Sequence, residues 1–153
     1  MLTVSPQAGP GSRLRTGAGP AASRGGGRTT IVGMARKDEL GRAGEERAAA
    51  YLTHEGYTVL ARNWRGRGGE LDVVACRGRD LVAVEVKTRR GEGFGHPLEA
   101  IDARKLRRVW RLALQWAAAH PEHARGRALR VDAIAVLGPD ARAAAIEHLE
   151  DLR

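Results

Sequence analysis

Residues 70–87 read ELDVVACRGRDLVAVEVK, and this stretch decides the fold that the sequence predicts. It holds two apolar runs, residues 70–76 and 81–87, with a glycine and several charged residues between them. Short runs rich in β-branched residues predict strands, and the connection Arg77–Asp80 is short enough for a tight turn. The second run is apolar on both faces until its end, which is typical of a central strand. We therefore expect two neighbouring strands in the middle of a β-sheet.

Charged residues stand near the ends of these two strands, where apolar residues would be easier to bury. Side chains two positions apart on a strand share a face, so Glu70 lies with Asp72, and Glu85 lies with Lys87. If the strands pair through the short turn, both charged pairs meet at one edge of the sheet. Burial of such groups is unfavourable by several kcal/mol unless they are paired or bind a metal. The pattern indicates a divalent-cation site, for which Mg²⁺ with carboxylate and phosphate oxygens is suited. The alternative is an ordinary ion pair between Lys87 and Asp72.

A helix is predicted before the strands, over residues 37–55. Apolar and small residues recur there every three or four positions, as on one face of a helix. They are Leu40, Gly44, Ala48, Tyr51 and Leu52. Glu45 lies on this stripe, which we expect to face the core, whereas Glu46 lies nearer the solvent-facing side of the helix. A glutamate facing the core needs a cation or a basic partner, so Glu45 is a candidate to join the strand carboxylates.

The remaining segments complete the predicted domain. We expect a strand over residues 57–61, a glycine-rich turn, a loop over 91–97, a helix over 102–119 and a strand over 129–137. Residues 141–149 fit either a helix or an edge strand. The order helix, three strands, helix, strand predicts a small α/β domain with a mixed sheet.

Composition narrows the class of protein. The 153 residues include 26 Lys+Arg against 18 Asp+Glu, which gives a formal charge of +8. Most of the basic residues are arginines, whose planar guanidinium suits phosphate, so the excess favours an anionic partner. The single cysteine, Cys76, excludes an internal disulfide and a four-cysteine zinc site, and it favours a reducing cytoplasm. No stretch approaches the ~18–20 apolar residues of a membrane span, so we expect no membrane partner.

The charge is concentrated at the N-terminus. Residues 1–33 hold four Arg, no acidic residue and eight of the 20 Gly. They show no apolar periodicity, so we expect a disordered Gly/Arg/Pro-rich tail. Contact of this basic tail with nucleic acid is the functional alternative. Met34 is a plausible start codon, which would make the start at Met1 a mis-assignment and leaves residues 34–153 as the predicted folded domain.

Arginines gather in three places that could contact nucleic acid. Four lie on one ridge of the helix over 102–119, two follow Trp64 at the glycine-rich turn, and a third group directly follows Lys87. These candidates are Arg104, Arg107, Arg108, Arg111, Arg65, Arg67, Thr88, Arg89 and Arg90. Such ridges suit a phosphate backbone, although a solvated helix face is the plainer alternative.

Several short motifs resemble the YraN family of small bacterial proteins. They are Gly44-Glu45, Arg62-Asn63-Trp64-Arg65, Gly69-Glu70-Leu71-Asp72, Val84-Glu85-Val86-Lys87-Thr88-Arg89 and Arg130-Val131-Asp132. That family belongs to the restriction-endonuclease-like superfamily with the PD-(D/E)xK signature, and it is similar in layout to archaeal Holliday-junction resolvases. The resemblance covers about residues 36–137. It implies a three-layer fold with a central mixed β-sheet flanked by helices.

The resemblance also implies roles for individual residues. Lys87 matches the lysine that activates the attacking water and stabilises charge on the phosphorane, and Glu70 is accessory. Asp72, Glu85 and Glu45 match carboxylates that bind Mg²⁺ or Mn²⁺, with the Val86 carbonyl as a further ligand. The same four side chains, Asp72, Glu85, Lys87 and Glu45, are the expected catalytic set.

Two functions from different classes follow. The first is a metal-dependent endonuclease that acts on DNA, in preference to RNA, with branched or otherwise structured DNA as a candidate substrate. The second is a nucleic-acid-binding module of the same fold that cleaves poorly or not at all. Enzymes of this fold that cut branched DNA usually dimerise, so a homodimer is a candidate assembly.

Overall fold

The computed structural model describes residues 14–17, 31–91, 93 and 95–153. Its strands are β1 (Leu14–Gly17), β2 (Thr58–Gly66), β3 (Gly69–Arg77), β4 (Asp80–Arg89), β5 (Ala128–Leu137) and β6 (Ala145–Leu149). Its helices are α1 (Ile31–His54), α2 (Ala103–Ala119), the one-turn α3 (Pro121–Ala124) and the 3₁₀ helix η1 (Pro97–Ala100).

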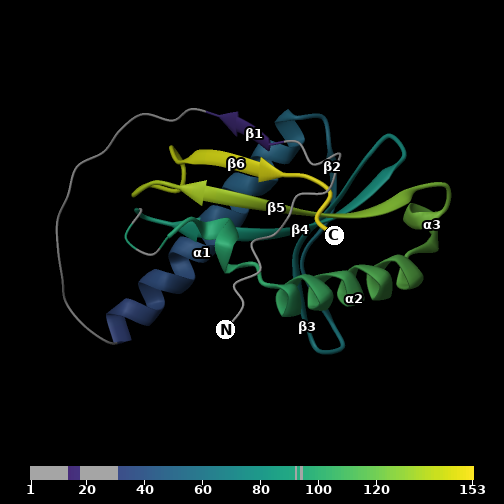
Figure 1. Ribbon diagram of the computed structural model, residues 1–153, viewed down its shortest axis with the longest axis horizontal. Coiled ribbons are helices and arrows are strands. Elements are labelled where there is room, and N and C mark those ends of the chain that lie inside the picture. The colour runs from purple at the N-terminus through teal and green to yellow at the C-terminus, as the bar shows by residue number, and fades with distance from the viewer. Residues whose placement is uncertain (1–13, 18–30, 92, 94) are drawn as a thin grey trace.

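The strands form one sheet with the order β1-β6-β5-β4-β3-β2 (Figure 1). β4 and β5 run parallel, whereas the other neighbours are antiparallel. A parallel pair needs a long crossover, and here the crossover contains α2. The expected mixed sheet is confirmed, with β4 near its centre.

The two long helices cover opposite faces of the sheet. On one face Ala48 and Leu52 of α1 pack with Val84 and Ile134. On the other face Leu112 and Trp116 of α2 join the cluster that covers the sheet. Full burial of a large apolar side chain contributes about 1.5–3 kcal/mol, so these two clusters hold the layers together. The three-layer α/β arrangement expected of a restriction-endonuclease-like fold is confirmed.

The predicted hairpin is present, with β3 and β4 paired from Arg77 opposite Asp80 to Val73 opposite Val84. β2 is longer than expected, because it continues through Trp64 to Gly66 beside β3. The ambiguous segment at 141–149 contains the short strand β6, which lies between β5 and β1.

Two elements of the structure include residues from the segment 1–33, for which a disordered tail is predicted. Leu14–Gly17 form β1, because the outer edge of β6 offers unpaired backbone groups with which a strand can pair. α1 begins at Ile31, ahead of the predicted start, and residues 31–36 contain no proline that would interrupt the helix. The rest of the predicted tail lies outside the described residues, and so does the question of the start codon.

Among the described residues, no helix combines the length and the apolar character needed to span a lipid bilayer.

Candidate functional site

The site begins where β3 and β4 stop pairing. The backbone ladder ends at Val73 and Val84. Asp72 precedes Val73 on β3 and turns its carboxylate toward β4. Its Oδ2 accepts a hydrogen bond of 2.8 Å from the backbone N–H of Val86. The carboxylate therefore takes the place of a strand carbonyl and is fixed beside the Glu85-Val86-Lys87 segment.

Glu85 and Lys87 lie on the face of β4 that α2 covers. The Nζ of Lys87 donates a hydrogen bond of 2.7 Å to Oε1 of Glu85. Glu85 is buried, with 4% of its side chain exposed, and it also has Nη2 of Arg108 from α2 at 3.9 Å. The alternative drawn from sequence pairs Lys87 with Asp72, whereas the structure pairs it with Glu85.

The electrostatic environment of Asp72 includes both of the other carboxylates. The pKa of Asp72 is raised from 3.8 to about 7, first by burial and second by the negative charge of Glu85. Glu45 raises this pKa further, while the Val86 N–H and the charge of Lys87 oppose the rise. The pKa of Asp72 thus responds to the charges of Glu85, Glu45 and Lys87.

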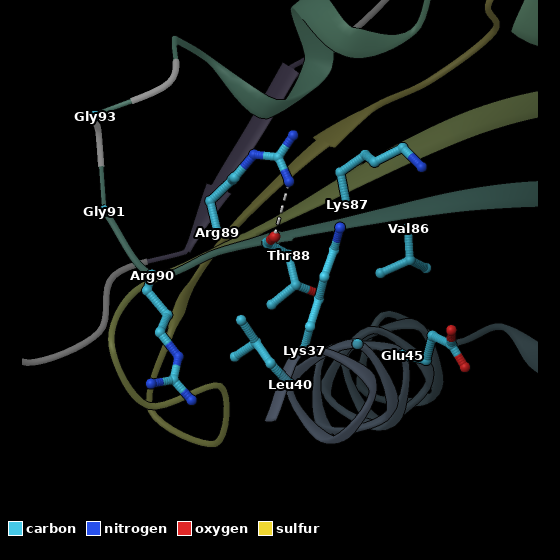
Figure 2. Close-up of a pocket in the computed structure, with 11 residues that line it drawn as sticks. Lys37, Leu40, Glu45, Val86, Lys87, Thr88, Arg89, Arg90, Gly91 and Gly93 are labelled. Carbon is cyan, nitrogen blue, oxygen red and sulfur yellow. Dashed lines mark hydrogen bonds between the residues drawn. The ribbon is translucent and has the colours of Figure 1, made fainter. Parts of the chain in front are cut away.

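Gly44 explains how α1 brings Glu45 to this place. A Cβ at Gly44 would lie 1.8 Å from Oγ1 of Thr88, so only glycine permits this approach of α1 to the end of β4. The next residue, Glu45, lines a cavity of about 680 Å³ together with Val86 and Lys87. Figure 2 shows Glu45 on the turn of α1 near Val86.

Glu70 is directed elsewhere. Its Oε2 accepts a hydrogen bond of 3.2 Å from Nε of Arg65 on β2. It lines a second cavity of about 650 Å³, to which Glu45 also contributes. Glu70 therefore borders the carboxylate group from the β2 side, and its nearest charged partner is Arg65.

The predicted nucleic-acid-binding residues fall into three groups around the site. Thr88, Arg89 and Arg90 line the 680 Å³ cavity, and Arg65 lines the 650 Å³ cavity. Arg67 lies in the turn after β2, where its backbone N–H and carbonyl bond to the side chain of Gln115 at 2.9 and 3.2 Å. On α2, a third cavity of about 360 Å³ is bordered by Arg104, Lys105, Arg107, Arg108 and Arg111.

Two cations of α1 join the site without having been predicted. Lys37 borders both cavities beside Glu45, and Arg42 borders the one at β2. The signal was present in the sequence, because Lys37, Gly41 and Glu45 are spaced by four residues and share one helix face.

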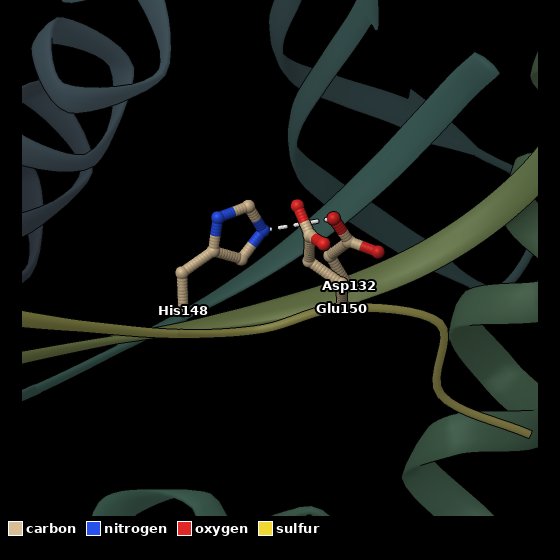
Figure 3. Close-up of side chains that lie close together, drawn as sticks. All are labelled: Asp132, His148 and Glu150. Carbon is tan, nitrogen blue, oxygen red and sulfur yellow. Dashed lines mark hydrogen bonds and ion pairs between the residues drawn. The ribbon is translucent and has the colours of Figure 1, made fainter. Parts of the chain in front are cut away.

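A second polar group lies under α1, at β5 and β6. Asp132, His148 and Glu150 are buried and each offers a ligand atom within 4.8 Å of the others, so they are positioned to hold a metal ion (Figure 3). This group is not predictable from the sequence pattern, because each of its members is a single polar residue on or beside an apolar strand, without a characteristic spacing.

Arginine already neutralises much of this second group. Nε and Nη2 of Arg130 donate to the two oxygens of Asp132, both at 2.9 Å, and Nε2 of His148 lies 2.8 Å from Oδ2. Arg130 also donates to the hydroxyl of Tyr57 at 2.8 Å, and that hydroxyl donates to Glu150 at 3.1 Å. Because both oxygens of Asp132 are engaged, a metal ion would have to displace Arg130 from them.

The chain matches a known protein family. The family described as "Uncharacterised protein family UPF0102" matches residues 44–136. The chain belongs to this family. The assignment to the YraN family made from the motifs is thereby confirmed. The matched residues include Glu45, Asp72, Glu85 and Lys87, whereas His148 and Glu150 lie beyond them.

Individual UPF0102 proteins are similar over most of their length. One from Beutenbergia cavernae is 51% identical over 116 residues, which cover 76% of this chain and 97% of the relative. One from Arthrobacter sp. is 47% identical over 116 residues, with the same shares of 76% and 97%. One from Frankia alni is 48% identical over 118 residues, or 77% of this chain and 97% of the relative.

Proposed function

We propose that this protein is a metal-dependent endonuclease that binds DNA and hydrolyses its phosphodiester bonds. One observation carries the proposal: Asp72, Glu85 and Lys87 meet at the point where β3 and β4 part, and α1 adds Glu45 to them. Three carboxylates gathered at a strand end beside a lysine have no evident use in packing, because their mutual repulsion opposes folding.

The donor set suits a hard divalent cation. Asp72, Glu85 and Glu45 offer carboxylate oxygens, and the carbonyl of Val86 offers another oxygen, which is the ligand chemistry of Mg²⁺ and Mn²⁺. These residues would hold the metal. A bound Mg²⁺ or Mn²⁺ polarises a phosphoryl oxygen and lowers the pKa of a bound water.

Lys87 supplies the positive charge of the protein itself. Its ammonium lies on Glu85 in a partly protected position, with 21% of the side chain exposed. A lysine has three donors and a flexible stem, so the group can hold a water molecule beside the phosphate or neutralise the charge that grows on its oxygens. Both tasks fit the place of Lys87 beside the carboxylates.

Cations extend from the carboxylates in two directions, and this supports cleavage within a strand. Arg89 and Arg90 border the cavity on one flank of α1, while Arg42 and Arg65 border the cavity on the other flank. Glu45 borders both. A nucleic-acid backbone that crosses the site would therefore have arginines on each side of the bond to be broken, where they can contact its phosphates. The preference for DNA over RNA, the structured substrate and the homodimer rest on the resemblance to the resolvases.

A binding module without cleavage is the second candidate. It is favoured by the contacts of Glu85, whose charge is already balanced by Lys87 and Arg108. In that case the arginine surfaces would still bind DNA, and the carboxylates would serve to order the lysine and arginine.

The deciding experiment is a cleavage assay of the full chain on linear, flapped and four-way DNA with Mg²⁺, Mn²⁺ or EDTA. Asp72→Asn and Lys87→Met should abolish cleavage, whereas Glu46→Gln on the exposed side of α1 should not. Metal-dependent cleavage lost in both variants supports the endonuclease. Salt-sensitive DNA binding without cleavage under any metal supports the binding module, and the absence of both rejects the two proposals.

A further inference from the structure

Arg108 differs from the other arginines of α2. It shares the 360 Å³ cavity with Arg104, Arg107 and Arg111. Within the part of the chain that the structure describes, Arg108 is the member of this group that forms an ion pair with a carboxylate of the candidate site, at 3.9 Å from Glu85. It therefore links the basic ridge of α2 to the place where β3 and β4 part.

The side chain of Arg108 passes beside the glycine at the start of β3, and the absent Cβ there leaves room for Leu112 of the same helix. A Cβ on Gly69 would lie 3.5 Å from Cδ and 3.8 Å from Nε of Arg108, and only 3.0 Å from Cδ1 of Leu112. The φ angle of Gly69 is 157°, which disfavours a side chain as well. The adjoining turn is fastened to α2 by the two bonds between Arg67 and Gln115. The base of Arg108 is thus held in place over β3.

The guanidinium at the end of this stem keeps unused donors. The 3.9 Å contact with Glu85 is too long for a hydrogen bond, and the buried Nε of Arg108 has no hydrogen-bond partner among the described residues. Arg130 shows what a structural arginine looks like in the same protein, because it bonds both oxygens of Asp132 at 2.9 Å. Arg108 is close to a carboxylate but is not satisfied by it.

We infer that Arg108 binds the phosphate that is being cleaved, while Arg104, Arg107 and Arg111 bind its neighbours along the strand. The inference rests on the proposed endonuclease function and assigns it a further catalytic residue. A planar guanidinium can donate two parallel hydrogen bonds to phosphate oxygens, which Lys87 cannot do. Arg108 stays protonated throughout and transfers no group. Its contribution grows as charge builds on the phosphoryl oxygens in the transition state.

The test compares Arg108→Gln with Arg107→Gln on the full chain, with kcat and KM measured separately in Mn²⁺. Loss of a preorganised donor at the reacting group lowers kcat by about 10²–10³-fold, so this is the fall expected for Arg108→Gln. Arg107→Gln should mainly raise KM, since it removes a contact with a flanking phosphate. Arg125→Gln, exposed after α3, should change neither value.

Two further measurements separate catalysis from folding. Arg108→Lys keeps the charge but loses the fork, and it should recover only part of kcat. The thermal midpoint and the DNA affinity of Arg108→Gln in EDTA should stay close to those of Arg107→Gln. If the wild-type chain cleaves and the two glutamine variants lose kcat equally, the role of Arg108 is rejected alone. If the wild-type chain cleaves no DNA, the endonuclease and this inference are rejected together.

Discussion

The carboxylate of Asp72 accepts the backbone N–H of Val86 at 2.8 Å, just beyond the last backbone pair between β3 and β4. This bond does two things. It satisfies a strand N–H that has lost its partner, and it ties an ionisable group to the segment that carries Glu85 and Lys87. The carboxylate that would bind a metal therefore also takes part in the hydrogen bonding between β3 and β4.

Asp72 makes the stability of the metal-free protein depend on pH. Its pKa is about 7 in the folded chain against an ordinary 3.8, so the folded state binds more protons between these values. Stability then falls as pH rises from about 4 through 7. Asp72→Asn removes the charge but can still accept the Val86 N–H. In EDTA at pH 8 we expect this variant to be more stable than wild type by ~2 kcal/mol, and equally stable at pH 3.5.

Urea unfolding at several pH values would check this prediction. Asp38→Asn, exposed near the start of the predicted helix, provides a matched control that should leave the pH profile unchanged. A wild-type stability that does not fall between pH 4 and 8 would contradict the expectation. Addition of Mg²⁺ should reduce the difference between wild type and Asp72→Asn, because a cation offsets the repulsion.

The prediction of the fold and of the candidate site rests mostly on local sequence patterns, namely apolar runs, turns and the spacing of charged residues. The two apolar runs of residues 70–87 and the short turn between them predict that Asp72, Glu85 and Lys87 lie near each other, since a hairpin joins neighbours in sequence. The remaining contacts join distant segments. β1 pairs with β6 across most of the chain, and Arg108 reaches Glu85 from α2, which packs on the same face of the sheet. The periodicity of apolar residues does not predict such long-range contacts, because they depend on how the helices and the sheet pack together.

Gly44 should tolerate no side chain. A methyl group there would meet Oγ1 of Thr88 at 1.8 Å, with Cβ and Cγ2 of Thr88 at 2.9 and 3.0 Å, so α1 would have to move away from β4. We expect Gly44→Ala to destabilise the protein by about 1–3 kcal/mol and to lower metal-dependent cleavage. Gly41→Ala is the control on the same helix, with nothing within 4 Å, and should stabilise by about 0.5–1 kcal/mol. Thermal unfolding of both variants decides the matter, and equal shifts of the same sign would disprove it.

Arg130 should be essential for folding and not for cleavage chemistry. It bonds to Asp132, to Tyr57 and, at 3.0 Å, to Asp80, and without it the fully buried Asp132 would keep an unbalanced charge. Loss of one partner of a buried ion pair typically costs about 3–5 kcal/mol, and we expect this loss for Arg130→Met in chemical unfolding. Arg130→Met/Asp132→Asn should be more stable than the single variant, because the unbalanced charge of Asp132 is removed as well. Arg153→Met, which breaks an exposed ion pair with Asp151, should leave the midpoint nearly unchanged.

The ridge of α2 should govern the salt dependence of DNA binding. Each contact between the protein and a phosphate releases bound counterions and contributes about −0.9 to the slope of log K against log salt concentration for duplex DNA. Arg104 and Arg107 are exposed on the ridge, so Arg104→Gln/Arg107→Gln should reduce the magnitude of the slope by about 2. The matched control is Arg79→Gln/Arg125→Gln, which also removes two exposed arginines. These residues precede the first residues of the parallel strands β4 and β5, whereas Thr88 lies near the other end of β4. Fluorescence anisotropy between 50 and 300 mM KCl in EDTA measures both slopes. A control pair that lowers the slope as much as the ridge pair would show that net charge, and not the face of α2, draws the DNA.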